Sequence, residues 1–164
     1  MKKYTKEEIK EMDKKADIAI KTMTVAGVGI GFAPIGIDVT AFMVAMGAGV
    51  VSIGKCYYQE ITKDDAGELI KKFFMAAGTT LAMVSVGQKI ATSILKSNAI
   101  TYLPAMVADA VICGATAFAV GSTSKNYFHR RAEGKKATEE DIKKWMKEGK
   151  IQGKKVAKKI AEEK

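Results

Sequence analysis

Uncharged stretches far longer than those of an ordinary surface helix divide this chain. Residues 22–54 carry a single charge, Asp38; residues 73–88 carry none; and residues 97–124 carry only Asp109. A helix on the surface of a soluble protein normally presents a polar face to water. Helices that lack charge on every side must instead be buried, by other parts of the protein or by lipid. The pattern therefore predicts an apolar middle with charged segments around it.

Several local signals mark where helices begin. Threonine followed three residues later by an acid, which is the capping-box spacing, occurs at Thr5, Thr62 and Thr138. The only two prolines, Pro34 and Pro104, fit the first turn of two further helices. No segment alternates between polar and apolar residues with the period of a strand. The sequence thus predicts an all-α fold, a bundle of about five helices near residues 5–32, 36–58, 62–96, 103–132 and 138–163.

Small residues recur at four-residue spacing in the predicted apolar helices. The spacing occurs at Gly27 and Gly31, at Ala41, Ala45 and Gly49, and at Ala115 and Ala119. Side chains this small on one face let two helix backbones approach closely, in a membrane or in a tightly packed soluble bundle. The glycines of the last predicted helix, Gly149 and Gly153, are expected to weaken it.

Asp38 and Asp109 are the isolated acids of the two helices that a proline is expected to open. In lipid, an ionisable side chain is costly and points to a function. An acid in the first turns of a helix also interacts favourably with the helix dipole, and a lysine could pair with it. We favour this structural role for both acids, and we interpret Pro34 and Pro104 as structural positions at which the helices begin.

The glycine-rich stretch GVGIGFAPIGID, at residues 27–38, raises the question of a phosphate-binding loop. A Walker A loop needs a lysine and a hydroxyl residue directly after its glycines, but the next lysine here is Lys55. A dinucleotide-binding loop follows a strand, whereas the preceding residues have a helical pattern. The one histidine, His129, has no nucleophile or carboxylate motif beside it and is expected to be exposed among cations. We therefore predict no enzyme activity, no catalytic residue, no metal and no cofactor.

Positive charge concentrates at the C-terminus. The net charge is +9, and residues 125–164 carry +7 of it, from twelve Lys and two Arg against seven acids. This predicts a helical apolar core domain at residues 1–132, with a charged N-terminal helix, and a basic amphipathic tail at residues 133–164. Such a tail helix can bind anionic lipid through its lysines and an apolar face of Ile142, Trp145 and Met146. Its lack of Arg and of interleaved aromatic residues argues against nucleic acid.

Lysines and aromatic residues directly follow two of the uncharged stretches. Such groups are typical of helices anchored at a membrane surface. Cations near a helix C-terminus are equally common in soluble proteins, so both interpretations stay open. The candidate anchors are Lys55, Tyr57, Tyr58, Lys125, Tyr127, Phe128, Arg130 and Arg131, with Trp145 in the tail.

Three segments together resemble a known family. They read APIGIDVTAFMVAMGAGVVSIGKCYY, ITKDDAGELIKKFFMAAGTTLA and YLPAMVADAVICGATAFAVGSTSKNYF. They are similar to a helical domain of unknown function that follows small bacterial GTPases and also occurs in YcjF-like inner-membrane proteins. The resemblance implies an all-α, membrane-associated module that works beside a GTPase or membrane machinery without catalysis of its own. Pro34, Asp38, Pro104 and Asp109 match the family pattern as structural positions.

We consider three functions. The first is a non-enzymatic, membrane-associated accessory or interaction module, on the cytoplasmic side of a bacterial inner membrane, that partners a GTPase or membrane machinery. The second is a colicin-like pore-forming or toxin-like bundle, with residues 22–54 as its apolar hairpin. The third is a soluble, cytoplasmic interaction module, completed by a partner protein or a second copy. Two cysteines without a disulfide framework, and an N-terminus unlike a secretory signal, favour the cytoplasmic side of the membrane.

Overall fold

The computed structural model describes residues 4–33, 39–78 and 99–163, and within these ranges every regular element is a helix. The prediction of an all-α bundle is confirmed, whereas Pro34 and Asp38 lie outside the described residues. The helices are α1 (Lys6–Gly31), α2 (Val39–Cys56), α3 (Lys63–Ala76), α5 (Ala99–Ala132) and α6 (Glu139–Glu162).

Three of the helices begin at the predicted threonines. Thr5, Thr62 and Thr138 are the N-caps of α1, α3 and α6, and each forms a complete capping box with the acid three residues later. In α3, for example, the backbone N–H of Thr62 donates to Asp65 at 2.8 Å. This hydrogen bond holds the pKa of Asp65 below its usual value. A cap of this kind contributes about 1 kcal/mol, so the helix starts are local properties of the sequence.

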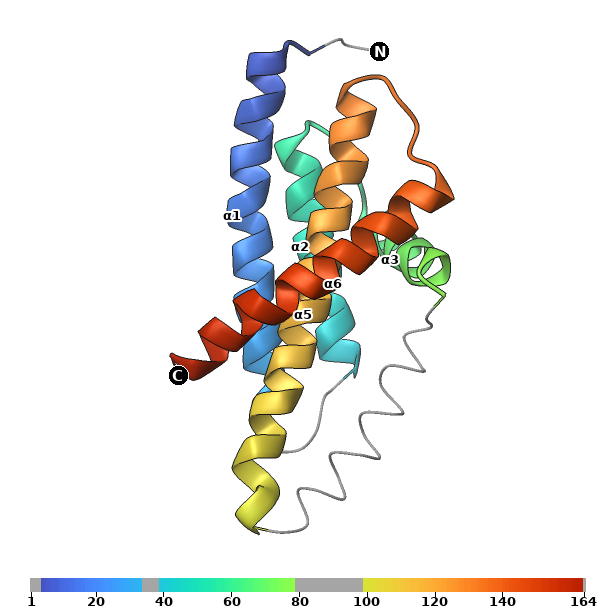
Figure 1. The fold of residues 1–164 in the computed structure, drawn as a ribbon. Helices are drawn as coiled ribbons and strands as arrows, with labels where there is room; N and C mark the ends of the chain where they lie inside the picture. Colours follow the sequence, from blue (N-terminus) through green and yellow to red (C-terminus); the bar gives the residue numbers. More distant parts are fainter. Residues whose placement is uncertain (1–3, 34–38, 79–98, 164) are drawn as a thin grey trace.

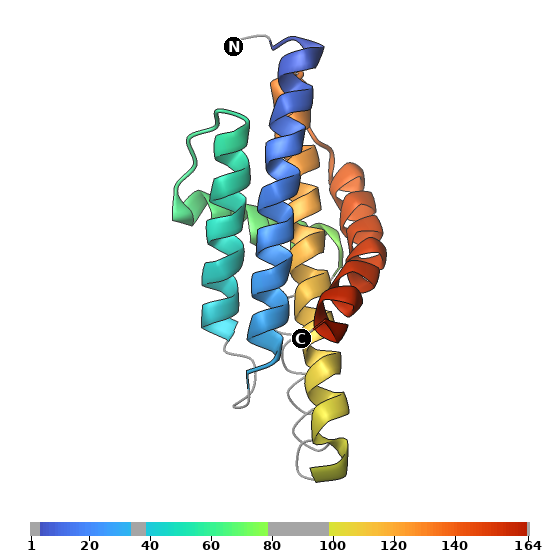
Figure 2. The same cartoon turned by 90° about the vertical axis from the view of Figure 1, so that its left-hand side faces the viewer.

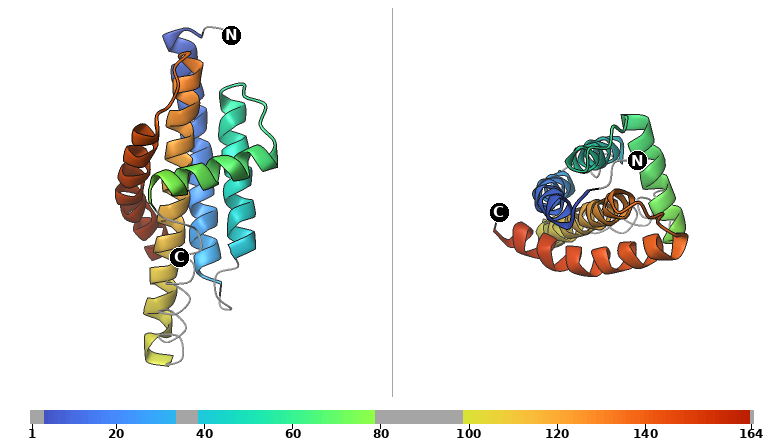
Figure 3. Two further views of the ribbon diagram at one scale, coloured as in Figure 1. Left: turned by 90° about the vertical axis from the view of Figure 1, so that its right-hand side faces the viewer. Right: turned by 90° about the horizontal axis from the view of Figure 1, so that it is seen from above.

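Three helices, α1, α2 and α5, stand side by side, and α3 and α6 cross them. α1 runs antiparallel to α2 and to α5, which lies between the other elements (Figures 1 and 2). α6 crosses α5 obliquely on one side of the bundle, and α3 crosses on another (Figure 3). The core between them is rich in aromatic residues, with Tyr57, Phe73, Phe74 and Phe128 fully or almost fully buried.

Glycines allow α5 to be approached closely from two sides. A Cβ on Gly31 of α1 would lie 2.6 Å from the backbone nitrogen of Ala110. A Cβ on Gly153 of α6 would lie 2.7 Å from the carbonyl oxygen of Ala115. The predicted close packing through Gly27 and Gly31 is therefore confirmed. Gly153, expected only to weaken the last helix, is instead a contact point, because only a residue without a side chain fits there.

The start of α5 differs from the prediction. The helix begins at Ala99, so Pro104 lies in its second turn and does not open it. A proline lacks one backbone N–H, and the residues before it can still form a helical turn. Asp109 consequently lies well past the first turn, where the helix dipole has little effect.

The end of α3 also differs from the prediction, which extended this helix to residue 96. α3 ends at Ala76, because Gly78 adopts a positive φ of 69°. A glycine in this left-handed conformation is the usual terminator of a helix. Its backbone N–H donates to the carbonyl of Met75 at 2.9 Å, which satisfies one of the carbonyls at the end of the helix.

We expect Gly153→Ala to lower the free energy of unfolding by about 1–3 kcal/mol, because the new methyl group overlaps the backbone of α5. Gly67→Ala in α3 is the matched control, since nothing lies within 4 Å of its Cβ position. That variant should gain about 0.5–1 kcal/mol from helix propensity alone. Urea unfolding of both variants measures the difference; a Gly153→Ala protein as stable as Gly67→Ala would contradict the close contact.

Candidate functional site

Two of the candidate membrane anchors belong to the core. Tyr57, just after α2, and Phe128, on α5, are completely buried, and their rings stack with centroids 6.3 Å apart. Neither side chain can reach a membrane surface in this fold, so the anchor interpretation is wrong for these two. Tyr58, by contrast, is exposed, with a φ of 54° that turns it outward onto the ring of Tyr4.

A polar cluster joins α1, α2 and α5 around Asp13. The buried Tyr57 hydroxyl donates a hydrogen bond to Asp13 Oδ1. His129 Nδ1 lies 3.0 Å from the same oxygen, and His129 Nε2 lies 3.9 Å from Glu133. His129 therefore has carboxylates on both sides, and the expectation that it stands among cations without an acidic partner is wrong. The tertiary fold supplies Asp13 from a helix more than 100 residues away in the chain.

The polar groups of this cluster have a structural role, because their interactions join helices. Burial and the nearby Asp13 carboxylate raise the pKa of Tyr57, so its hydroxyl stays protonated and acts as a donor. Burial also raises the pKa of the Cys56 thiol, which disfavours the reactive thiolate. Among the described residues, no group of three or more His, Cys, Asp or Glu side chains has the arrangement of a metal site.

A second contact repeats the spacing of the first. Lys125 donates to Asp17 at 2.6 Å, four residues away from the Asp13–His129 pair on each helix. Because α1 and α5 are antiparallel, the acids at i and i+4 on α1 face the basic residues at i+4 and i on α5. The matched four-residue spacing was visible in the sequence and would have predicted this register.

The remaining cations of the α5 end also contact other helices. Arg130 donates to Asp141 at 3.0 Å and lies over the ring of Trp145, which connects α5 to the start of α6. The Tyr127 ring packs edge-on against Phe73, with Arg131 on its surface. These candidate anchors therefore hold helices together. Lys55, at the end of α2, is exposed.

Asp109 is buried beside the closest contact of α1 and α5. Its side chain is only 1% exposed, and a Cβ on Gly31 would lie 2.7 Å from its carbonyl oxygen. Its place in the helix interior is at odds with the favoured role as a first-turn acid. The structure brings it together with the small residues of α1, beside Gly31.

The apolar face of the C-terminal helix, α6, packs against the rest of the bundle. Ile142 and Met146 are fully buried against the rest of the bundle, as are Gly149 and Gly153. The predicted apolar face of the tail is thus occupied, and a lipid cannot reach it in this fold. The opposite face, which we call the lysine face of α6, is exposed to solvent; it contains Lys143, Lys144, Lys147, Lys154, Lys155 and Lys158, with Ile151 among them.

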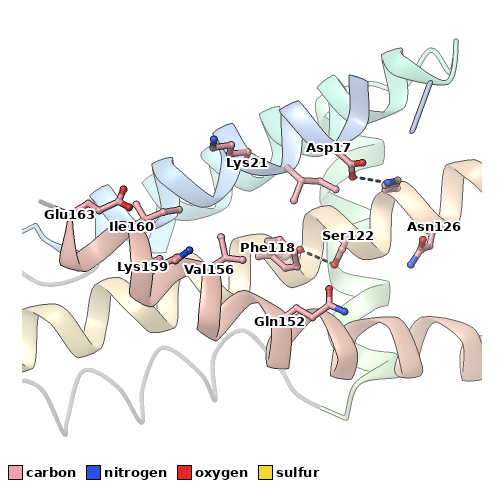
Figure 4. A pocket seen from close by; sticks show the side chains of 12 residues that line it. Asp17, Lys21, Phe118, Ser122, Asn126, Gln152, Val156, Lys159, Ile160 and Glu163 are labelled. Carbon is pink, nitrogen blue, oxygen red and sulfur yellow. Dashed lines mark hydrogen bonds and ion pairs between the residues drawn. The ribbon is translucent and has the colours of Figure 1, made fainter. Parts of the chain in front are cut away.

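An open groove lies where α1, α5 and α6 diverge (Figure 4). Its volume is about 600 Å³, and Phe118 and Ser122 of α5 form its floor. Lys21 stands on the α1 wall and Lys159 on the α6 wall. The combination of apolar and cationic side chains makes this groove a candidate binding site that the sequence did not reveal, because its walls come from three distant segments.

One helix in the described part of the chain is long and apolar enough to cross a membrane. It comprises Met106–Ala132, and most of it is buried inside the bundle. The core helix of a soluble protein has the same properties, so this helix is weak evidence for a membrane protein.

Comparison with known proteins identifies a family. A family model described as a domain of unknown function, DUF697, matches residues 1–163. The match therefore includes α6 as well as the apolar core. No curated protein and no solved structure matches the chain.

We expect the Asp13 cluster to contribute measurably to stability. Asp13→Ala leaves the buried Tyr57 hydroxyl without its acceptor, which should cost about 1–3 kcal/mol of unfolding free energy. Tyr57→Phe removes the hydroxyl but keeps the ring, and should cost about 0.5–1.5 kcal/mol. A double-mutant cycle in urea measures their coupling. If the loss of unfolding free energy in the double variant equals the sum of the losses in the two single variants, the hydrogen bond contributes nothing to stability.

Proposed function

The chain belongs to the DUF697 family, and from this premise and the geometry of the bundle we propose that it is a membrane-associated helical module without catalysis of its own. In this proposal it rests on an anionic membrane, as an accessory to a GTPase or other membrane machinery. The observation that carries the membrane part is the separation of charged and uncharged surfaces along the bundle.

The uncharged segments of three helices meet at one end of the bundle. α1 beyond Lys21 contacts the first half of the described α5, as the Gly31–Ala110 approach demonstrates. The charged part of α1 lies at the opposite end, where Asp17 meets Lys125. We call residues 22–33, 39–49 and 106–115 the uncharged end; the one acid in these ranges, Asp109, is buried.

Apolar side chains on this end face outward. Val25, Val44 and Val107 are exposed there, and Val44 is 64% exposed. An apolar surface without charge favours contact with the boundary between the head groups and acyl chains of a bilayer over contact with water. A shallow contact of this kind fits the burial of most of Met106–Ala132 better than a spanning arrangement does.

The lysine face of α6 supplies the electrostatic part of the proposal. The C-terminal part of α6 packs beside the uncharged end, through Ala157 and Ala161 against Val28 and Ala110. The lysines in the C-terminal half of this helix therefore lie beside the α1 and α5 part of the apolar surface, whereas α2 is on the other side of the bundle (Figure 2). Each lysine close to an anionic leaflet contributes about 1 kcal/mol of attraction, so apolar and ionic contacts could form together.

The partner part of the proposal rests on the resemblance to domains that follow GTPases. Residues 1–164 contain no Walker A sequence, so the GTPase partner would supply the nucleotide-binding site. The absence of catalysis is supported by the cluster around Asp13, where His129 contacts carboxylates and Tyr57 is held as a donor.

Flotation with lipid vesicles tests the membrane part. Wild-type protein should float with vesicles that contain phosphatidylglycerol, and less with pure phosphatidylcholine or at high salt. Val44→Glu should lower the partition coefficient about fivefold or more, because the carboxylate resists entry into the bilayer. Met75→Glu on α3 is the matched control: Met75 is 73% exposed but lies outside the uncharged end, so its binding should be near wild type.

Two outcomes would contradict the membrane proposal: wild-type protein that never floats, or equal binding of the two glutamate variants. Release of a dye trapped in the same vesicles would instead favour the pore-forming alternative.

The partner part of the proposal needs a test in cells, with a photo-crosslinking amino acid at the exposed Ile18. A GTPase among the crosslinked proteins would support the accessory role, and crosslinked proteins without one would remove it.

A further inference from the structure

We propose that the groove between α1, α5 and α6 binds a single anionic lipid molecule, with its acyl chain on the apolar floor and its head group between Lys21 and Lys159. This inference deepens the proposed membrane function and rests on it, since the membrane supplies the ligand. It goes further by assigning a site for one lipid molecule, distinct from the contact of the bundle with a bilayer surface.

The shape of the groove follows from how the helices cross. α6 comes closest to α5 at Gly149 and Gly153, where a Cβ would lie within 2.8 Å of the α5 backbone. α1 lies on the neighbouring side of α5 (Figure 3). Between α1 and the C-terminal half of α6, the surface of α5 is not covered, and the groove that this leaves has a volume of about 600 Å³. This volume is within the range of about 300–1,000 Å³ of small-molecule sites.

The lining is apolar in the centre of the groove. Ile20 of α1, Phe118 of α5 and Val156 and Ile160 of α6 contribute hydrocarbon surface. Ile20 is buried, and the other three are partly buried. The Ser122 hydroxyl donates to the Phe118 carbonyl at 2.9 Å, so it does not require a ligand partner. An acyl chain fits such a floor better than a polar ligand, because it displaces water from apolar side chains without leaving polar groups unpaired.

The charges on the walls select an anion. Lys125 is already paired with Asp17 at 2.6 Å, whereas no ion pair of Lys21 or Lys159 occurs among the described residues. The two ammonium groups belong to opposite walls, and one carboxylate, Glu163, lies in the same part of the groove (Figure 4). Two cations against one acid leave a net positive charge, which favours a phosphate or carboxylate head group over a neutral or cationic one.

The test uses a monomeric probe, so that binding does not require a bilayer. Dansylundecanoic acid below its critical micelle concentration should bind the full-length protein with a stoichiometry of one, and lysophosphatidylglycerol should displace it. Monoacylglycerol and an alkyltrimethylammonium of equal chain length should compete at least about tenfold less well, and inorganic phosphate should not compete. Equal competition by the anionic and cationic amphiphiles would overturn the proposal, and so would binding of many probe molecules.

Variants of the walls make the test specific to this groove. Lys21→Gln with Lys159→Gln should weaken probe binding about tenfold, and Glu163→Gln should strengthen it about twofold. Lys147→Gln with Lys154→Gln, on the lysine face, removes the same charge elsewhere and should leave probe binding unchanged. Gln152→Trp, which fills the groove from an exposed position, should abolish binding without loss of stability in urea.

Flotation of the same variants separates this proposal from the membrane proposal. A protein that floats with anionic vesicles but does not bind the monomeric probe would overturn the lipid site and leave the membrane association intact. A protein that binds the probe in the predicted order of variants, yet never floats, would keep the lipid site and overturn membrane association. Equal effects of the groove and lysine-face pairs on probe binding would show that net charge alone matters, and would overturn the site.

Discussion

The close approach of two helices to α5 is the contact on which the rest of this structure depends. Gly27 and Gly31 bring α1 against one side of α5, and Gly149 and Gly153 bring α6 against another. At these positions a methyl group would overlap backbone atoms, so the contacts define where the helices can lie. The direction of α6 then determines both the lysine face and the walls of the groove. Dispersion forces between closely packed backbones hold a bundle whose α5 offers few large side chains near the crossings.

Polar contacts set the register at the other end of the same helix pair. Asp13 with His129, and Asp17 with Lys125, have matching four-residue spacings on antiparallel helices. A shift of one helical turn would leave only one acid of α1 opposite a basic residue of α5, and only one of the two glycines at a close contact with α5. Close packing at one end and charge pairing at the other therefore specify a single alignment. The same alignment collects the charges of α1 and α5 at one end, and among the described residues of these two helices it leaves only the buried Asp109 at the other.

This separation explains how one small bundle can present three different surfaces. The uncharged end offers apolar side chains such as Val44, the lysine face offers positive charge, and the groove combines both kinds of surface in a confined volume. The groove also lies between the other two surfaces, because its walls are α1 beyond Asp17 and the C-terminal half of α6. The proposals for membrane contact and for a bound lipid therefore draw on one architecture, although they concern different sites.

The sequence by itself determined the helical fold, the three threonine caps and the use of small residues for close packing, because these depend on local backbone chemistry and side-chain volume. It did not determine which apolar or charged residues would meet. In the sequence, Tyr57 and Phe128 have the pattern of surface anchors, but the fold buries both side chains. His129 contacts the Asp13 carboxylate because α1 lies beside α5, and Glu133 lies on its other side. The end of α3 before Gly78 and the start of α5 at Ala99 also escaped prediction, since a glycine tolerates several backbone conformations and a proline need not be the residue that opens its helix. The groove belongs wholly to the tertiary structure: its lining residues are far apart in the chain, and only the crossing of three helices gives them a common surface.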